Sequence, residues 1–283
     1  MAAPLEIRPL PEAFGAEVLG FDASQSGDAE TARTWHEALD RHQLLVFRDV
    51  ALEAEAQLAL TQTLGAPLLE NESGRAWQFV SNTHEEGILG DERFAFHSDH
   101  AFMEDPIEVI SLYGLEIPTA GTSTRFVNGL IGARSLPPEL LARVTGRRAR
   151  HIIDPGAESG RVPVRGPRLP DDLPHAWHPI LWPGGRSAEP ILYVSEQQTD
   201  RVEGLSEDES RALIEALFAH LYREDHAYTH TWRAGDLVLW DNRALQHARD
   251  AIPLGASRNL RRISVGGTPV YEYFRRHEKW GLD

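Results

Sequence analysis

Two side chains of metal-ligand type, His97 and Asp99, stand two positions apart, and a second histidine, His247, lies 150 positions after the first. In a β-strand, residues i and i+2 project from the same face, so the imidazole of His97 and the carboxylate of Asp99 can converge on one point. Two imidazoles and one carboxylate bind one face of an octahedral metal and leave its other positions open. These residues therefore predict a mononuclear metal site that can accept further ligands.

The identity of the metal stays open on these residues, because histidine and aspartate also bind zinc. A catalytic zinc site usually leaves one open position and a structural zinc site leaves none, whereas oxygen activation by Fe(II) needs open positions. With 13 histidines in the chain, a histidine that only forms hydrogen bonds is the simplest alternative for His97. Phe94, Phe96 and Phe102 indicate a partly buried strand end, where ionisable groups are costly. His100 is predicted to lie on the opposite face and is not counted as a ligand.

Two arginines, Arg258 and Arg262, follow His247 by eleven and fifteen residues. Residues 258–265 are predicted to form a final strand, in which the two arginines share a face and Arg261 lies on the other face. A buried guanidinium needs an anion, and its N–H donors match a carboxylate with two parallel hydrogen bonds. The pair favours a site for a dicarboxylate cosubstrate or an acidic substrate. The alternative is an internal salt bridge to one of the 43 acidic residues.

Together these motifs resemble the taurine dioxygenase and aryloxyalkanoate dioxygenase family of Fe(II)- and 2-oxoglutarate-dependent oxygenases. The resemblance rests on His97-x-Asp99, on the block W-x-x-G-D-x-x-x-W-D-N-x-x-x-x-H that ends at His247, and on the two arginines that follow. Residues 7–18 and 44–49 also resemble the family's N-terminal strand, helix and strand. The resemblance therefore spans most of the chain.

The resemblance implies a role for each matching residue around the metal. His97, Asp99 and His247 would hold Fe(II), and 2-oxoglutarate would chelate the metal through its C1 carboxylate and keto oxygen. The distal carboxylate of 2-oxoglutarate would pair with Arg258, aided by the hydroxyl group of Thr124. Dioxygen would be the second cosubstrate.

The resemblance also implies which residues line the substrate pocket. Arg262 would lie near the metal-binding end of the cosubstrate and reach an anionic group of the substrate, and Phe102 matches an aromatic wall. Arg93 stands where taurine dioxygenase-like members have asparagine, and the segment that ends at Gln198 lacks their aromatic residue. Both departures disfavour taurine as the substrate. Arg93 is expected either to recognise an anionic group or to form an exposed ion pair.

Three functional hypotheses follow. The first is a dioxygenase that hydroxylates a C–H bond of a small anionic molecule while 2-oxoglutarate is decarboxylated to succinate. The second keeps the same cofactor chemistry but gives desaturation, epoxidation or cyclisation of a natural-product intermediate. The third is a metal-binding barrel protein or zinc hydrolase without oxygen chemistry. A halogenase is disfavoured, because related halogenases have a small residue in place of the carboxylate of Asp99.

The elements around the motifs predict a mainly β fold with flanking helices and a double-stranded β-helix core of the cupin-like, jelly-roll kind. Helical spacing or capping signals mark residues 28–39, 52–64 and 135–144 and the segment after the capping box Ser206-x-x-Glu209. Strand patterns mark residues 108–115, 122–127 and 237–240. Helices are thus expected both before the first ligand and between the two halves of the site.

We expect one domain over residues 1–283, with an insert around 155–190 that is rich in proline, glycine and arginine. Loops of this length are often lids or disordered segments. A net charge of −15 argues against nucleic acid as a partner, and the chain has no cysteine. With no apolar run of 18 residues and no signal peptide, we expect a soluble cytoplasmic protein without membrane contact. The resemblance is compatible with a homo-oligomer.

Overall fold

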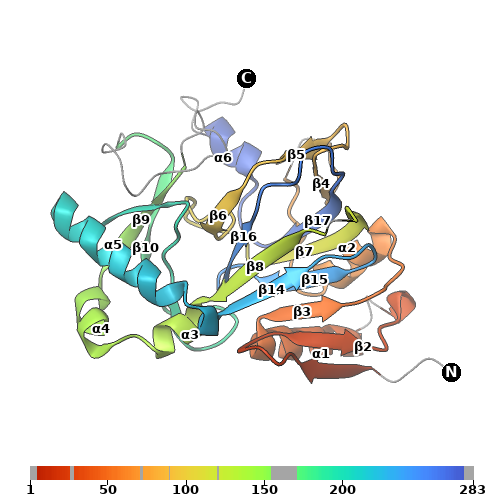
Figure 1. The fold of residues 1–283 in the computed structure, drawn as a ribbon, viewed down its shortest axis with the longest axis horizontal. Helices are drawn as coiled ribbons and strands as arrows, with labels where there is room; N and C mark the ends of the chain where they lie inside the picture. Colours follow the sequence, from red (N-terminus) through yellow and green to blue (C-terminus); the bar gives the residue numbers. More distant parts are fainter. Residues whose placement is uncertain are drawn as a thin grey trace.

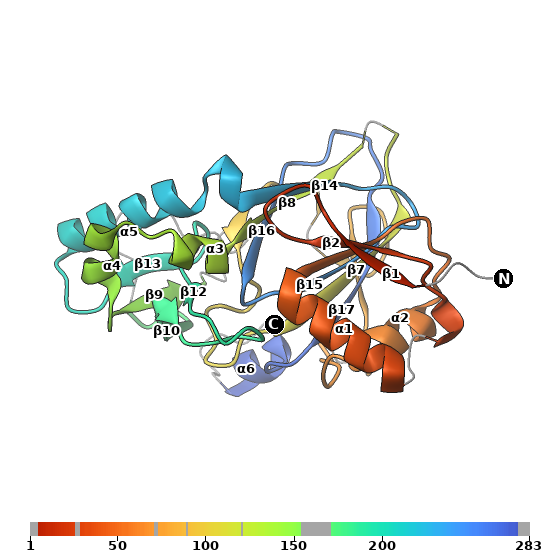
Figure 2. The same cartoon turned by 90° about the horizontal axis from the view of Figure 1, so that it is seen from below.

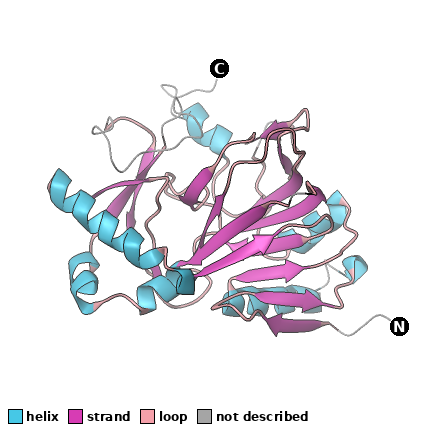
Figure 3. Cartoon of the chain, in the orientation of Figure 1, coloured by secondary structure: helices cyan, strands magenta, loops and turns pink. Residues whose placement is uncertain are grey.

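The computed structural model describes residues 5–25, 29–70, 73–88, 90–119, 121–153 and 171–276. Its centre consists of two mainly antiparallel sheets (Figures 1 and 3). In spatial order, the larger sheet contains β1 (Glu6–Pro9), β2 (Ala16–Leu19), β3 (Leu44–Phe47), β15 (Leu237–Asp241), β7 (Val109–Glu116), β17 (Asn259–Val265), β4 (Gln78–Ser81) and β5 (Gly87–Ile88). The smaller sheet contains β14 (Ala227–Thr231), β8 (Ser123–Asn128), β16 (Leu245–Arg249) and β6 (Phe94–His97). The predicted jelly-roll core is confirmed.

Strand β15 is apolar at four successive positions because both faces of the larger sheet are covered. Val238 and Trp240 belong to the core between the two sheets, together with Phe126 of the smaller sheet. Leu237 and Leu239 belong to a second core on the outer face. The helices α1 (Ala29–His42) and α2 (Ala54–Gln62) cover this outer face (Figure 2). Because these helices cover only the outer face, the functional site can lie between the two sheets.

A helical layer lies beside the two sheets, at the left of Figure 1. Its longest helix, α5 (Glu207–Leu221), begins with the predicted capping box, in which Ser206 accepts from the backbone N–H of Glu209 and the Glu209 side chain accepts in return. Its apolar face packs in a core that includes residues of β9 (Arg148–Ile152) and β13 (Thr199–Val202). The remaining elements are η1 (Ala23–Gln25), α3 (Gly129–Arg134), α4 (Pro138–Val144), β10 (His175–Pro179), β11 (Leu181–Trp182), β12 (Ile191–Leu192), η3 (Glu224–His226) and α6 (Val270–Arg276).

The expected helices and strands before and within the site are present, with small shifts at their ends. Helices α1, α2 and α4 correspond to the predictions at 28–39, 52–64 and 135–144, and strands β7 and β8 to those at 108–115 and 122–127. Of the expected insert, residues 155–170 lie outside the described residues, and residues 171–190 contain β10 and β11. The single domain and the lid stay predictions. None of the described helices has the length and apolar character needed to span a membrane.

Candidate metal centre and cosubstrate cavity

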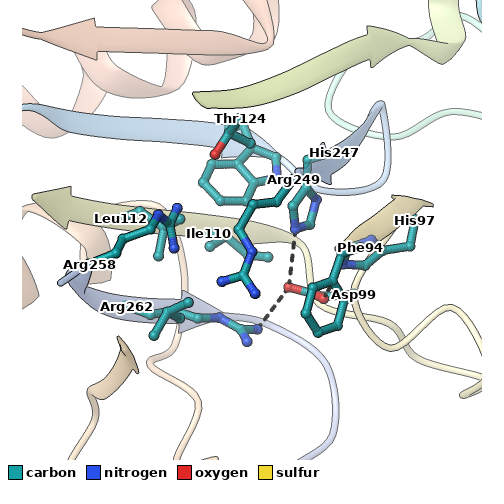
Figure 4. A pocket seen from close by; sticks show the side chains of 12 residues that line it. Phe94, His97, Asp99, Ile110, Leu112, Thr124, His247, Arg249, Arg258 and Arg262 are labelled. Atoms are coloured by element: carbon teal, nitrogen blue, oxygen red, sulfur yellow. Dashed lines mark ion pairs between the residues drawn. The ribbon is translucent and has the colours of Figure 1, made fainter. Parts of the chain in front are cut away.

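The metal-ligand side chains converge because β6 and β16 are neighbours in the smaller sheet. Their register places His97 opposite His247, and the two imidazole centroids are 4.2 Å apart. The carboxylate of Asp99 lies between them, with Oδ1 3.3 Å from Nε2 of His97 and Oδ2 3.9 Å from Nε2 of His247 (Figure 4). Among the described residues, this is the one group of three His, Cys, Asp or Glu side chains with metal-binding spacing.

Asp99 reaches the site for a different reason from the one predicted. Strand β6 ends at His97, so Asp99 lies in the following turn and not on the same strand face. Its backbone is held by Asn242, whose Oδ1 accepts from the N–H of Asp99 and whose Nδ2 donates to the carbonyl of Asp99, both at 3.0 Å. Asn242 also donates to the carbonyl of Ile107 at 2.9 Å. This buried amide therefore anchors the turn that carries the carboxylate ligand.

His100 is not part of the group formed by His97, Asp99 and His247, and like Asp99 it lies beyond the end of the strand. It has a positive φ of 60°, and its Nε2 is 4.0 Å from Oε1 of Glu70. Burial and the charge of Arg262 lower the pKa of His100 to about 4. The imidazole is therefore neutral at neutral pH. The same turn that brings Asp99 inward directs His100 to a different neighbour.

The orientation of His97 and the protonation states of Asp99 and His247 suit metal binding. Nδ1 of His97 lies 2.8 Å from the carbonyl of Ala95, which fixes the ring with Nε2 toward the centre. Burial would raise the pKa of Asp99, but the guanidinium of Arg262 holds it well below its usual value. Burial lowers the pKa of His247 to about 3. A carboxylate at Asp99 and a neutral imidazole at His247 are thus available.

A cavity of about 50 Å³ lies between the sheets next to the three ligands. Thr124 and Arg258 line it, as the resemblance implied, together with Arg249 and Arg262. Arg258 is 1% exposed, and its Nε and NH1 have no hydrogen-bond partner in the described structure. Burial and the neighbouring charge of Arg249 lower the pKa of Arg258 to about 9. An uncompensated guanidinium of this kind requires an anion.

Arg262 already has anionic partners inside the protein. Its NH2 lies 2.9 Å from Oε1 of Glu70 and 3.1 Å from Oδ2 of Asp99. The other oxygen of Glu70 accepts from the hydroxyl of Ser264 at 3.0 Å. The internal salt bridge weighed as an alternative therefore exists for Arg262. Arg261 lies on the other face of β17, as predicted, where its Nε donates to Oε1 of Gln57 at 2.7 Å.

Glu70 is the main site residue that the sequence analysis missed. It is 7% exposed, and the hydrophobic residues before it, Leu68 and Leu69, give no sign that the next side chain faces a metal centre. Burial raises the pKa of Glu70, and Arg262 opposes this effect. The sequence signal that could have found it is the need of a buried Arg262 for a carboxylate.

A larger cavity of about 590 Å³ opens on the other side of the ligands. Phe102 and Gln198, both expected at the substrate pocket, line it together with Glu70 and Arg262. Phe102 also stacks on Phe274 of α6, at 6.2 Å between ring centroids, so the C-terminal helix supports this wall. The structure does not bring Arg93 to the site. Arg93 is exposed and does not line either cavity.

Residues 6–264 match the model of the family described as taurine catabolism dioxygenase TauD, TfdA family. The chain belongs to this family. It is 30% identical over 282 residues to pentalenolactone F synthase of Streptomyces arenae, covering 92% of this chain and 94% of that protein. It is 27% identical to the α-ketoglutarate-dependent 2,4-dichlorophenoxyacetate dioxygenase of Cupriavidus pinatubonensis, covering 91% and 96%. A taurine dioxygenase structure from Burkholderia xenovorans superposes with a TM-score of 0.79 at 26% identity, covering 93% and 91%.

This member of the TauD, TfdA family is an Fe(II)- and 2-oxoglutarate-dependent dioxygenase that uses O₂. Its side chains fit these groups. His97, Asp99 and His247 offer a donor set that suits Fe(II), with room on the cavity side for further ligands. The unpartnered guanidinium of Arg258 lies in the same cavity, as a dicarboxylate requires. The hypothesis of a barrel without oxygen chemistry is thereby set aside.

Proposed function

We propose that the enzyme oxidises a C–H bond of a small anionic molecule bound in the larger cavity, while 2-oxoglutarate occupies the smaller cavity. The observation that carries this proposal is the position of the three ligands, because His97 and Asp99 line both cavities. A substrate in one cavity and a cosubstrate in the other would meet at the metal. Such proximity is a main source of rate acceleration in enzymes.

In the smaller cavity, His97, Asp99 and His247 hold Fe(II), and Arg258 pairs with the distal carboxylate of 2-oxoglutarate. Fe(II), 2-oxoglutarate and O₂ supply the oxidising chemistry, with release of succinate and carbon dioxide. Thr124 is 2% exposed, and its hydroxyl accepts from the indole N–H of Trp232 at 2.9 Å, which leaves the hydroxyl proton free to be donated to the carboxylate. The protein thus orients the cosubstrate and keeps this end of it from water.

In the larger cavity, Phe102 provides an apolar wall, and Gln198 and Arg262 provide polar groups. Arg262 lines this cavity 3.1 Å from the carboxylate of Asp99, and we assign to it the anionic group of the substrate. The similarity to an enzyme named for 2,4-dichlorophenoxyacetate, a carboxylate with an aromatic body, supports this class of substrate. Glu70 neutralises part of the charge of Arg262, which favours a substrate with a single anionic group.

A second outcome of the same chemistry has support of its own. The chain is 30% identical to an enzyme named for the synthesis of pentalenolactone F, and this similarity is the reason to keep desaturation, epoxidation or cyclisation as a second outcome. The site geometry is the same for both outcomes, because both begin with removal of a hydrogen atom from a C–H bond beside the metal. Analysis of the product separates them, since hydroxylation adds one oxygen atom and desaturation removes two hydrogen atoms.

The proposal is tested in two steps. Anaerobic addition of Fe(II) and 2-oxoglutarate should give a weak visible charge-transfer band, and the protein loaded with Zn(II) serves as the control that gives none. A set of small acids is then screened for stimulation of succinate formation, with the corresponding neutral amides as matched controls. Stimulation by amides and not by acids would contradict the anionic substrate, and absence of the band would contradict the cosubstrate site.

A further inference from the structure

The smaller cavity contains a second guanidinium, that of Arg249, to which the resemblance gave no role. Arg249 and the ligand His247 are two residues apart on β16, so both side chains leave the same face of the strand. The pairing of β16 with β6 is irregular between these two residues, and Arg249 lies opposite Phe94. Such irregularities often redirect a side chain. Figure 4 shows the Arg249 side chain directed into the pocket, between Arg258 and Asp99.

The position of Arg249 is fixed by the protein. Its NH2 donates to the carbonyl of Gly90 at 2.9 Å and to that of Glu92 at 2.7 Å. Its guanidinium carbon lies 4.9 Å from the centroid of the Phe94 ring, a cation–π contact. Arg249 is 8% exposed. The guanidinium is therefore held in the cavity before any ligand arrives, which reduces the entropy lost on binding.

Two buried guanidinium groups in one cavity repel each other. Burial and, to a lesser extent, the neighbouring charge of Arg249 lower the pKa of Arg258. No carboxylate is paired with Arg258 in the described structure. Two like charges at low exposure are stabilised when an anion with several acceptor oxygens lies between them. The distal carboxylate of 2-oxoglutarate is such an anion.

We infer that Arg249 is a second receptor for the distal carboxylate of 2-oxoglutarate and that it sets the selectivity of the enzyme for a dicarboxylate over a monocarboxylate 2-oxo acid. The inference rests on the proposed placement of 2-oxoglutarate in the smaller cavity. The metal-binding end is the same in 2-oxoglutarate and in 2-oxopentanoate, which carries a methyl group in place of the distal carboxylate. Selectivity between these two acids therefore reports only on the distal end.

A structural role of Arg249 makes a different prediction. If the side chain only ties the loop at Gly90 and Glu92 to β16, its loss disturbs the cavity for both acids alike. If it binds the distal carboxylate, its loss weakens the binding of 2-oxoglutarate and not that of 2-oxopentanoate. The ratio of the two dissociation constants thus separates the two roles.

The test is calorimetric titration of the Mn(II)-loaded protein with each acid under nitrogen, for the wild type and for Arg249→Met. We expect the variant to bind 2-oxoglutarate about 10–100-fold more weakly, as for loss of one or two charge-assisted hydrogen bonds, with 2-oxopentanoate changed less than about threefold. Arg125→Met is the matched control. Arg125 also lies over a phenylalanine, with its guanidinium carbon 5.9 Å from the Phe96 ring, and it pairs with Glu224 outside both cavities.

Equal weakening of both acids, or no change in either, would overturn the inference. If Arg249→Met does not fold, as judged by thermal denaturation, Arg249→Lys retains the charge but loses the planar donors. That variant should still lose several-fold in affinity for 2-oxoglutarate and none for 2-oxopentanoate, and an unchanged ratio would again overturn the inference. Failure of the wild type to bind 2-oxoglutarate would instead contradict the proposed function.

Discussion

Replacing Arg258 by methionine is expected to stabilise the protein when 2-oxoglutarate is absent and to reduce its stabilisation by 2-oxoglutarate to half or less. Burial lowers the pKa of Arg258 from 12.5 to about 9. One pKa unit corresponds to about 1.4 kcal/mol, so the charged form is penalised by roughly 4–5 kcal/mol at neutral pH. Because the folded-state pKa is below the unfolded-state value, this penalty is fully present below pH 9 and fades above it. Methionine of similar length removes the penalty while it fills the space.

The effect of the ligand has the opposite sign. The wild type should gain about 2.7 kcal/mol at a 2-oxoglutarate concentration 100 times its dissociation constant. The variant lacks the guanidinium that pairs with the distal carboxylate of 2-oxoglutarate. Loss of this charge-assisted hydrogen bonding, at about 1.5–3 kcal/mol, should weaken binding by roughly 10–100-fold. Thermal denaturation of the Mn(II)-loaded protein with and without 2-oxoglutarate measures both quantities. One kcal/mol corresponds to roughly 2–4 °C in domains of 150–250 residues.

Arg261→Met is the matched control, because Arg261 lies on the same strand but faces away from the cavity. Its guanidinium donates to Gln57 and to the carbonyl of Leu52, so its loss should lower the melting temperature and leave the response to 2-oxoglutarate intact. The reasoning would be refuted if Arg258→Met melted below the wild type without ligand and kept the full shift with it. The charge of Arg258 would then have a partner within the protein.

Three further changes probe the ligand turn, the charge of the substrate cavity and the core. Asn242→Ala removes both hydrogen bonds to the backbone of Asp99, and the affinity for Mn(II), measured by calorimetry, should fall about 10–100-fold. An unchanged affinity would show that the turn keeps its conformation without Asn242. Glu70→Gln removes a negative charge 2.9 Å from Arg262, so binding of phenoxyacetate should tighten several-fold while that of phenoxyacetamide stays constant; equal changes for both would argue against a charge effect. Leu217→Ala in α5 empties a fully buried position and should cost about 2–5 kcal/mol in urea denaturation, without a change in 2-oxoglutarate affinity.

The candidate metal ligands could be predicted from the sequence, because their residue types suit a metal and strand geometry brings them together. His97 and His247 end up on paired strands, so any jelly roll with this register brings them together. Asp99 lies beside the two histidines, but the strand argument that placed it there does not hold, since the turn after β6 carries it. The spacing of two residues is short enough that either a strand or a turn brings the carboxylate to its neighbour.

The charged residues around the ligands were harder to predict, because their roles depend on burial and on distant partners. Glu70 forms an ion pair with Arg262, which is 192 positions later in the sequence, and no local sequence pattern predicts such a contact. Arg249 was not singled out, because the sequence does not show that β16 continues to residue 249 and places this side chain on the same strand face as His247. Arg93 had the charge expected of an anion receptor, but only the fold shows that its side chain is exposed.

The two cavities share a wall made of Phe94, His97, Asp99 and Arg262, and this wall has a thermodynamic consequence. A ligand that shifts Arg262 or Asp99 from one side changes the free energy of binding on the other side. By linkage, any factor by which a substrate tightens 2-oxoglutarate equals the factor by which 2-oxoglutarate tightens that substrate. An unknown substrate can therefore be recognised without turnover, from the change it causes in the dissociation constant of a cosubstrate that is already known.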